Sequence, residues 1–186
     1  MNITQILIQE HQLILMVLGL LQKARQRLEK GGQVPSAFFK AAMVFCSGFA
    51  DQFHHFKEEF LLFGLLSHKK QGKLDSAMGA LRYQHERCRE CIAGIRQSLP
   101  MYEENDGTAL TVLLENLAVY VSLLKRHIHE EDVVFFPLAD KTLSSEEKES
   151  LARQFEMEEE RVGGRSAVFE KYQEIADYLF EIMQKR

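Results

Sequence analysis

Apolar residues recur at steps of three and four along four long stretches of the chain. In the fourth stretch Leu110, Leu113, Leu117, Tyr120 and Leu124 keep these steps, which places their side chains on one face of an α-helix. No stretch keeps the alternation of apolar and polar residues that marks a half-buried strand. Each stretch spans roughly 25 to 32 residues, or about 40 Å of helix. The pattern therefore predicts an all-α protein.

Glycine and proline clusters separate the four stretches. They lie at residues 31–35, 69–73 and 99–107, and Pro137 follows the fourth stretch. Each of the three prolines falls where a long helical pattern is expected to stop. Four long helices with short connections predict an up-down-up-down four-helix bundle.

A fifth amphipathic stretch follows and predicts an additional C-terminal helix. Ser144 and Glu147 stand three residues apart, as in the capping box that begins a helix, and Gly163-Gly164 interrupts the stretch. We expect the bundle over residues 1–138 and a C-terminal helical extension, packed on it, over residues 139–186. A homodimer through the C-terminal helix is the alternative use of its apolar stripe. That stripe consists of Val168, Tyr172, Ile175, Leu179 and Ile182.

The composition is that of an ordinary soluble protein. The 186 residues carry a net charge of −4, and no run of Lys and Arg is longer than two, so nucleic acid is not an expected partner. The N-terminus lacks the signals of a secretory peptide. The longest unbroken apolar run, residues 13–18, is far too short to cross a membrane. Three cysteines argue against a disulfide framework. We therefore expect a cytoplasmic protein with no membrane partner.

A histidine interrupts each of the four apolar seams, by which we mean the inward-facing positions of one helix. Two seams also carry a glutamate one turn after the histidine. The six candidate metal ligands are His11, His54, Glu58, His85, His127 and Glu131. An unpaired buried imidazole costs about 1–3 kcal/mol and a buried carboxylate several kcal/mol, against a total stability of about 5–15 kcal/mol. A pair of divalent cations would compensate all six, and this donor set suits iron-like metals.

The two His-x-x-x-Glu units are the most specific part of the pattern. A separation of four places both side chains on one face of a helix. Residues 54–64 and 127–137 both read His-x-x-x-Glu-acidic-x-x-apolar-Phe, followed by Gly or Pro. His55 and Glu59 form a competing unit of the same spacing, but the repeat and the seam both favour His54 with Glu58.

At these residues the chain resembles the hemerythrin family in its broad HHE cation-binding form. The pattern of that family is His, then His-x-x-x-Glu, then His, then His-x-x-x-Glu. The matching pieces are Glu10-His11, residues 54–63, His85-Glu86 and residues 127–137. The resemblance implies two iron ions with an oxo, hydroxo or water bridge. It also implies that Glu58 and Glu131 bridge the irons and that the four histidines are terminal ligands.

The chain departs from the oxygen-carrying hemerythrins at two positions. Arg89 stands where they have a second histidine in the third helix, and the seam favours Glu131 although Asp132 has the spacing of their aspartate. One histidine fewer leaves more coordination positions for O2, peroxide or nitric oxide. We therefore expect a non-haem di-iron protein that binds or reacts with one of these small oxidants, rather than a simple reversible oxygen carrier.

The residues leave several alternatives open. One open question is whether the protein turns over a substrate, as a di-iron oxidoreductase or with a peroxide-degrading activity. An iron-sensing or iron-handling module without turnover and a metal-free helical interaction bundle are the competing functions.

Other polar residues are interpreted as structural. Cys88 and Cys91 have the spacing of a redox or zinc pair, but they lie in mid-helix without a second pair, so Cys88 is expected in the core. Tyr120 lies on the seam of the fourth helix, either as core or as a hydrogen-bonding group near the site. His68 and His129 are expected at the surface.

Overall fold

The chain folds into long helices joined by short connections. The computed structural model describes residues 3–69 and 72–184, and no strand occurs among them. In chain order the elements are α1 (Ile3–Glu29), α2 (Ser36–Phe45), η1 (Cys46–His55), η2 (Lys57–Leu62), α3 (Phe63–Ser67), α4 (Gly72–Glu103), α5 (Gly107–Glu130), η3 (Glu131–Phe135), α6 (Phe136–Thr142), α7 (Ser145–Arg161) and α8 (Arg165–Gln184). The three elements labelled η are π-helical segments inside longer helices.

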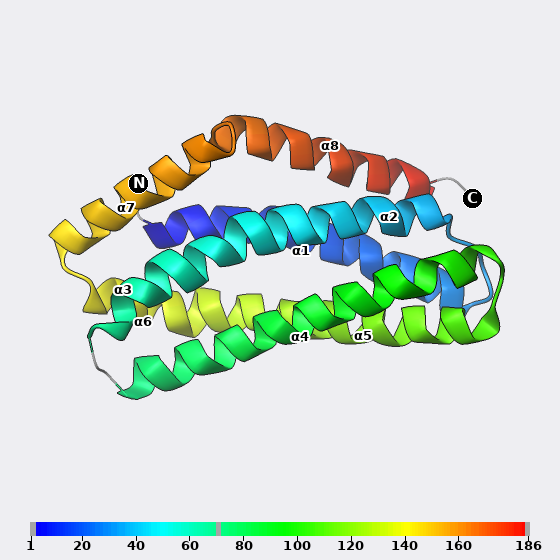
Figure 1. Ribbon diagram of the computed structural model, residues 1–186, viewed down its shortest axis with the longest axis horizontal. Helices are drawn as coiled ribbons and strands as arrows, with labels where there is room; N and C mark the ends of the chain where they lie inside the picture. The colour runs from blue at the N-terminus through cyan, green and yellow to red at the C-terminus, as the bar shows by residue number, and fades with distance from the viewer. Residues whose placement is uncertain (1–2, 70–71, 185–186) are drawn as a thin grey trace.

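The predicted up-down-up-down four-helix bundle is confirmed (Figure 1). Its four rods are α1, the continuous helix from α2 to α3, α4, and the continuous helix from α5 to α6. Residues 104–106 join α4 to α5, and there the Asp106 side chain accepts a hydrogen bond from the Ala109 backbone N–H (2.7 Å). The connection predicted at residues 69–73 includes residues 70 and 71, which lie outside the described residues.

Two prolines lie inside helices rather than at their ends, contrary to the prediction. Pro100 lies in the last turn of α4, which continues to Glu103, and near a helix end the loss of one hydrogen bond matters little. Pro137 lies in α6, directly after the π-helical segment η3. That segment has already replaced the i−4 hydrogen bonds with which a proline ring interferes. The fourth rod therefore continues to Thr142.

The additional C-terminal helix is present as two helices, α7 and α8, along one side of the bundle (Figure 1). The capping box of Ser144 and Glu147 begins α7 as predicted. Gly163 and Gly164 separate the two helices with φ of +101° and +89°, a conformation that glycine adopts without strain. α7 packs on η2 and α1, and α8 packs on α1 and α2. The domain division at residue 138 and the homodimer alternative stay predictions.

Two apolar clusters fill the bundle, and a layer of polar residues separates them. One cluster packs α8 against α1, α2, α4 and α5. The other packs α7 against α1, α3, α4 and α6. Between them every rod carries buried ionisable side chains. The interruption of the apolar seams in the sequence thus corresponds to a physical layer, which we call the polar layer.

Two of the described helices are long and apolar enough to cross a membrane by length and composition alone. They are Ile3–Glu29 and the continuous helix Gly107–Thr142. Core helices of soluble proteins meet the same criteria, and both helices contribute side chains to the apolar clusters. The feature is weak evidence for a membrane, and a chain without a membrane partner stays a prediction.

The packing of α8 on the second rod leaves no room for a side chain at Gly48. A Cβ there would lie 2.8 Å from Cζ of Tyr172, whose ring is held by Phe45 and Phe49 at centroid distances of 5.8 and 5.4 Å. We expect Gly48→Ala to lower the free energy of unfolding, measured in urea, by about 1–3 kcal/mol.

Gly79→Ala is the matched control for this packing. Gly79 lies in α4, and an added Cβ would meet nothing within 4 Å. Here the substitution is expected to stabilise the helix by about 0.5–1 kcal/mol. A Gly48→Ala variant as stable as the control would contradict the close approach of α8.

Candidate metal centre

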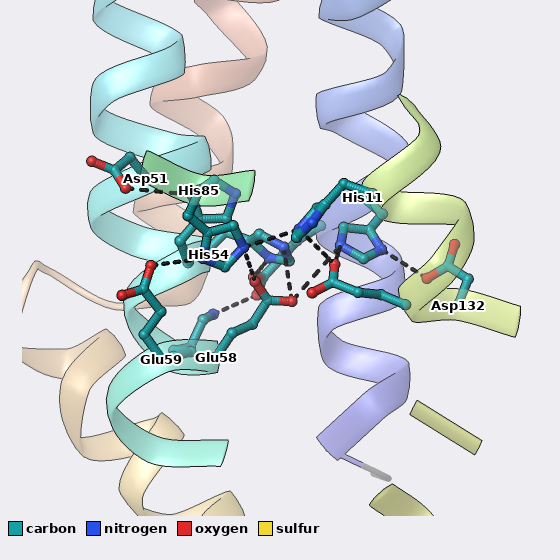
Figure 2. A network of polar contacts seen from close by, with 12 residues as sticks. His11, Asp51, His54, Glu58, Glu59, His85 and Asp132 are labelled. Carbon is teal, nitrogen blue, oxygen red and sulfur yellow. Dashed lines mark hydrogen bonds and ion pairs between the residues drawn. The ribbon is translucent and has the colours of Figure 1, made fainter. Parts of the chain in front are cut away.

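Seven side chains of metal-ligating types meet in the polar layer, and Figure 2 shows His11, His54, Glu58 and His85 among them. They come from all four rods, and the exposed fraction of each is 2% or less. They are His11 of α1, His54, His55 and Glu58 of the second rod, His85 of α4, and His127 and Glu131 of the fourth rod. The structure therefore brings together all six residues that the sequence singled out, and it adds His55.

The π-helical segments position the residues of the second and fourth rods. His54 and His55 end η1, Glu58 lies in η2, and Glu131 begins η3. Hydrogen bonds in a π-helix join residues i and i+5, so each turn is wider than an α-helical turn and successive side chains are rotated less about the axis. The imidazoles of His54 and His55 consequently both reach the interior. Segments of this kind occur frequently at functional sites.

The structure brings His55 into the polar layer beside His54, which the sequence analysis did not expect. The preference for His54 assumed the α-helical period, on which neighbouring residues point in different directions, whereas both imidazoles are buried in the polar layer. Glu59, the other half of the competing unit, does lie outside the layer, where it contacts His85. A pair of adjacent histidines one turn before the glutamate was the signal for His55, but no period in the sequence announces a π-helical segment.

Each of the five buried histidines has an oxygen acceptor at its Nδ1 atom. The acceptors, with their Nδ1···O distances, are Asp132 for His11 (2.7 Å), Glu10 for His54 (2.9 Å), Asp51 for His55 (3.3 Å), Glu59 for His85 (2.6 Å) and Gln84 for His127 (2.7 Å). Figure 2 shows Asp51, Glu59 and Asp132 around the histidines. Carboxylate and amide oxygens accept hydrogen bonds, so a neutral ring carries its proton on Nδ1 and a lone pair on Nε2. Metal-ligating histidines are oriented in the same way.

The Nε2 atoms face one another and two carboxylates. His85 Nε2 and His127 Nε2 are 3.0 Å apart. Glu131 lies 3.1 Å from His127 Nε2, and Glu58 lies 3.4 Å from His54 Nε2 and 3.5 Å from His85 Nε2. Atoms that bind one metal ion at about 2.0–2.2 Å lie about 3–3.5 Å from one another. The spacing therefore suits ligands of a shared ion.

The seven residues form two groups that are each able to hold a metal ion. Within each group the donor atoms lie within 4.8 Å of one another. One group consists of His55, Glu58, His85 and His127, and the other of His11, His54, Glu58 and Glu131. Glu58 belongs to both groups, which is the position of a bridging carboxylate.

The two central carboxylates lack hydrogen-bond donors. Both oxygens of Glu58 and of Glu131 are buried without a hydrogen-bond partner in the described part of the chain, as are Nε2 of His11 and of His55. Each such group costs about 1–3 kcal/mol, and more when it is charged. Among the described residues, no lysine or arginine forms an ion pair with either carboxylate. Cations are therefore what the donor set lacks, and the residues fit a pair of metal ions.

Opposite pKa shifts keep Glu131 and His55 in their metal-binding forms. Burial raises the pKa of Glu131, but the neighbouring His127 and His11 hold that pKa well below its ordinary value. Burial lowers the pKa of His55 well below its ordinary value, and the nearby His85 lowers it further. The carboxylate is thus ionised and the imidazole neutral, as metal ligands must be.

His54 shows that protons compete for the same centre. Burial lowers the pKa of His54, but the carboxylates of Glu58 and Glu10 outweigh burial and raise it to about 10. A metal ion that binds His54 must therefore displace a proton, so metal affinity falls as the solution becomes acidic.

Arg89 lies outside the polar layer and holds two of the carboxylates that contact its histidines. Its guanidinium donates hydrogen bonds to Asp51 (2.8 Å) and Glu59 (2.7 Å), the carboxylates that orient His55 and His85. The fifth imidazole of the layer comes from His55 in the second rod instead of from position 89 in the third. The expectation of extra coordination positions can therefore no longer rest on a missing histidine.

The other polar residues lie where the sequence analysis placed them. The Glu131 carboxylate points into the layer and Asp132 lies outside it, as the seam favours. His68 and His129 are exposed. Cys88 is a buried free thiol of the apolar core.

One pocket reaches the polar layer. It has a volume of about 300 Å³, it lies between η1 and α4, and His55 forms part of its wall. Its lining also includes Cys46 and Cys88, and burial raises the pKa of each thiol to about 12. A larger hollow of about 880 Å³ lies at the end of the bundle where α1 joins α2 and α4 joins α5. None of the seven residues lines it.

Comparison with known proteins points to the same chemistry. The sequence profile of the hemerythrin HHE cation binding domain matches residues 2–139. An uncharacterized protein of Mycobacterium bovis and uncharacterized proteins from two strains of Mycobacterium tuberculosis are each 26% identical over 171 residues, which is 92% of this chain and 66% of the relative. The chain thus spans slightly less than two thirds of the length of these relatives. No solved structure gives a significant match.

Cation binding is expected to stabilise the fold, because it compensates the buried carboxylates. Saturation at one hundred times Kd contributes about 2.7 kcal/mol, which corresponds to a rise in Tm of roughly 5–10 °C for a chain of this size. We expect this rise in calorimetry when Fe(II) is added without air to chelator-treated protein, and its reversal by chelator.

Two variants define the origin of that rise. Glu58→Gln keeps the shape of the side chain but removes the shared charge, so most of the rise should disappear. His129→Ala removes an exposed imidazole and should keep it. A Tm that is the same with and without metal would contradict a cation-dependent layer.

Proposed function

The chain belongs to the family of hemerythrin HHE cation-binding domains, and on that premise we propose that it is a non-haem di-iron protein that binds a small oxidant. The oxidant would be O2, peroxide or nitric oxide. Domains of this family bind metal cations, and two groups of His and Glu residues in this chain are able to hold them.

One observation carries the proposal: four imidazoles turn Nε2 toward two buried carboxylates, the fifth, His55, belongs to the same cluster, and an oxygen acceptor contacts every Nδ1. Imidazole nitrogens and carboxylate oxygens without thiolate suit iron, and neither group contains a cysteine. One iron would be held by His11, His54 and Glu131, the other by His55, His85 and His127, and Glu58 would serve both.

The chain itself orients the ligands and excludes water. Phe136 stacks on His11 at a centroid distance of 5.7 Å, and Phe63 lies parallel to His85 at 6.4 Å. These rings belong to the apolar cluster that packs α7, so that side of the polar layer is dry. When bound, an iron pair supplies Lewis acidity and electrons for a small oxidant.

The pocket beside His55 is the proposed access route of the oxidant. Its volume of about 300 Å³ is ample for molecules of a few atoms, and it is the one pocket of those described whose lining includes one of the seven ligand-type residues. The thiols of Cys46 and Cys88 stay protonated at neutral pH. Because the thiolate is the reactive form, an oxidant can pass these two side chains without consuming them.

We further propose that the protein acts in the cytoplasm, with a small oxidant rather than nucleic acid or a membrane as its partner. The three cysteines are free thiols, which fits a reducing compartment. The net charge of −4 does not favour binding to phosphate backbones.

The direct test is to load the chain with Fe(II) without air and then expose separate samples to O2, hydrogen peroxide and nitric oxide. We expect two irons per chain and new ultraviolet-visible bands, from bridging oxygen or ligand-to-metal charge transfer, with at least one oxidant. His55→Ala should lower the iron content or shift the bands because it removes one donor, whereas His129→Ala should leave both unchanged.

Other outcomes would assign other functions. Iron that binds and leaves reversibly, with a large change in Tm but no spectral response to any oxidant, would indicate an iron-sensing or iron-handling module. No bound iron, manganese or zinc, together with a His127→Ala variant as stable as the unsubstituted chain, would indicate a metal-free interaction bundle.

The access route is tested by closing its rim. Ala93 lies at the pocket on an exposed face of α4, so Ala93→Trp should slow azide binding to the oxidised, iron-loaded protein by about tenfold, as measured by stopped-flow absorption. Ala80→Trp, on an exposed position of the same helix but outside the pocket, is the control. Equal rates in the two variants, at equal iron content, would rule out this route.

A further inference from the structure

A cluster of ion pairs joins the helix pair α7–α8 to the polar layer. Lys57 Nζ lies 2.5 Å from Glu10 Oε1 and 2.9 Å from Glu159 Oε1. The Arg165 guanidinium lies 2.6 Å and 2.9 Å from the same two oxygen atoms. We call these four residues the junction cluster. Its two carboxylates and two cations balance in charge.

Three of the four members of the junction cluster are buried, and the side chain of the fourth, Arg165, is 24% exposed. Lys57 and Glu10 are exposed by 1% and 0%, and the Lys57 ammonium lies 3.8 Å from the ring centre of Phe53. Charge-assisted hydrogen bonds are strong and directional in such surroundings, and loss of one partner leaves a buried charge uncompensated. The cluster therefore holds its members in defined positions.

Glu10 connects the junction cluster to the histidines of the polar layer. Its Oε1 atom receives Lys57 and Arg165, while its Oε2 atom lies 2.9 Å from His54 Nδ1. One oxygen of the carboxylate is thus anchored and the other orients an imidazole.

The turn between α7 and α8 places two members of the cluster. Figure 1 shows the two helices meeting at an angle beside the bundle. The Gly164 N–H donates to the Glu159 carbonyl oxygen (2.9 Å), and the positive φ of Gly163 and Gly164 turns the chain there. Arg165, after the turn, consequently contacts Glu10 directly. Glu159, before the turn, contacts Lys57 and Arg165, the two cations that hold Glu10.

The other four histidines are oriented without α7 or α8. Their Nδ1 acceptors are Asp132, Asp51, Glu59 and Gln84, and in the contacts of the described residues these side chains meet only residues of the bundle. Glu10 alone among the five acceptors is held by residues beyond 139, outside the part of the chain that matches the HHE domain.

We propose that Glu159 and Arg165 are positioning residues of the metal centre: they hold Glu10, and through it His54, so that α7–α8 sets how tightly one of the two ions is bound. The inference rests on the proposed binding of two metal ions. The ion concerned is the one of the group His11, His54, Glu58 and Glu131.

The test is a stepwise titration of Co(II) into the full chain, followed by absorption and calorimetry. Arg165→Met removes the cation and keeps an unbranched side chain. Its effect on one of the two ions should be a loss of about tenfold in affinity, the lower end of the 10–100-fold range for loss of the direct partner of a ligating histidine, because Arg165 acts on His54 through Glu10. The affinity for the other ion should change much less, because the acceptors that orient His55, His85 and His127 do not contact Arg165.

Three further variants separate positioning from folding. Gln84→Leu removes the acceptor of His127 Nδ1. It should lower the affinity for the ion whose binding Arg165→Met leaves nearly unchanged. Arg165→Lys restores a cation and should recover most of the affinity. Arg161→Met, at an exposed arginine of α7 that pairs with Glu158, should leave both affinities unchanged. Glu159→Gln is the alternative to Arg165→Met if that variant does not fold.

The outcomes distinguish this inference from the proposed function. An unsubstituted chain that binds no Co(II) would defeat the proposed function. If it binds two ions, and both affinities are unchanged or equally reduced in Arg165→Met and Glu159→Gln, the positioning role is overturned while the di-metal centre stands. Equal reduction is the result expected of a cluster that only stabilises the fold.

Discussion

Two buried carboxylates without hydrogen-bond donors, surrounded by imidazoles in the middle of an apolar bundle, are the constraint on which the rest of this structure depends. All four oxygens of Glu58 and Glu131 are buried without a hydrogen-bond partner among the described residues, and buried carboxylates without compensation are costly. The apolar clusters on either side supply the burial that holds four rods together. The polar layer between them is destabilising by itself. Bound cations would coordinate its donor atoms and compensate the charge of its carboxylates.

Charge alternates outward from this layer. The central carboxylates face imidazoles, the imidazoles face outer acceptors, and three of those acceptors, Glu10, Asp51 and Glu59, face arginine or lysine side chains. Arg89 supports one side in this way, and Lys57 with Arg165 supports the other. No charge of the outer ring is therefore left to neutralise the centre, and each ring is held in one orientation. Such pre-orientation lowers the entropy lost on metal binding.

The π-helical segments explain how a regular bundle delivers so many ligand-type residues to one level. They lie where the second and fourth rods pass the layer, and they bring two adjacent histidines inward. His55 compensates in number for the arginine at position 89, which is itself used to support His55 and His85 through their carboxylates. The same irregularity lets the fourth rod continue through Pro137.

Hydrophobic periodicity was enough to determine the helices, their antiparallel order and the six residues whose polarity breaks the seams, because burial imposes a regular spacing that a polar residue visibly violates. The continuation of helices past Pro100 and Pro137 and the inward position of His55 followed only from tertiary packing, since a π-helical segment leaves no period to read. The junction cluster was also invisible, because Glu10 and Arg165 are 155 positions apart in the chain and nothing local pairs them. Sequence by itself determined which side chains must avoid water, and the tertiary structure decided which of them meet.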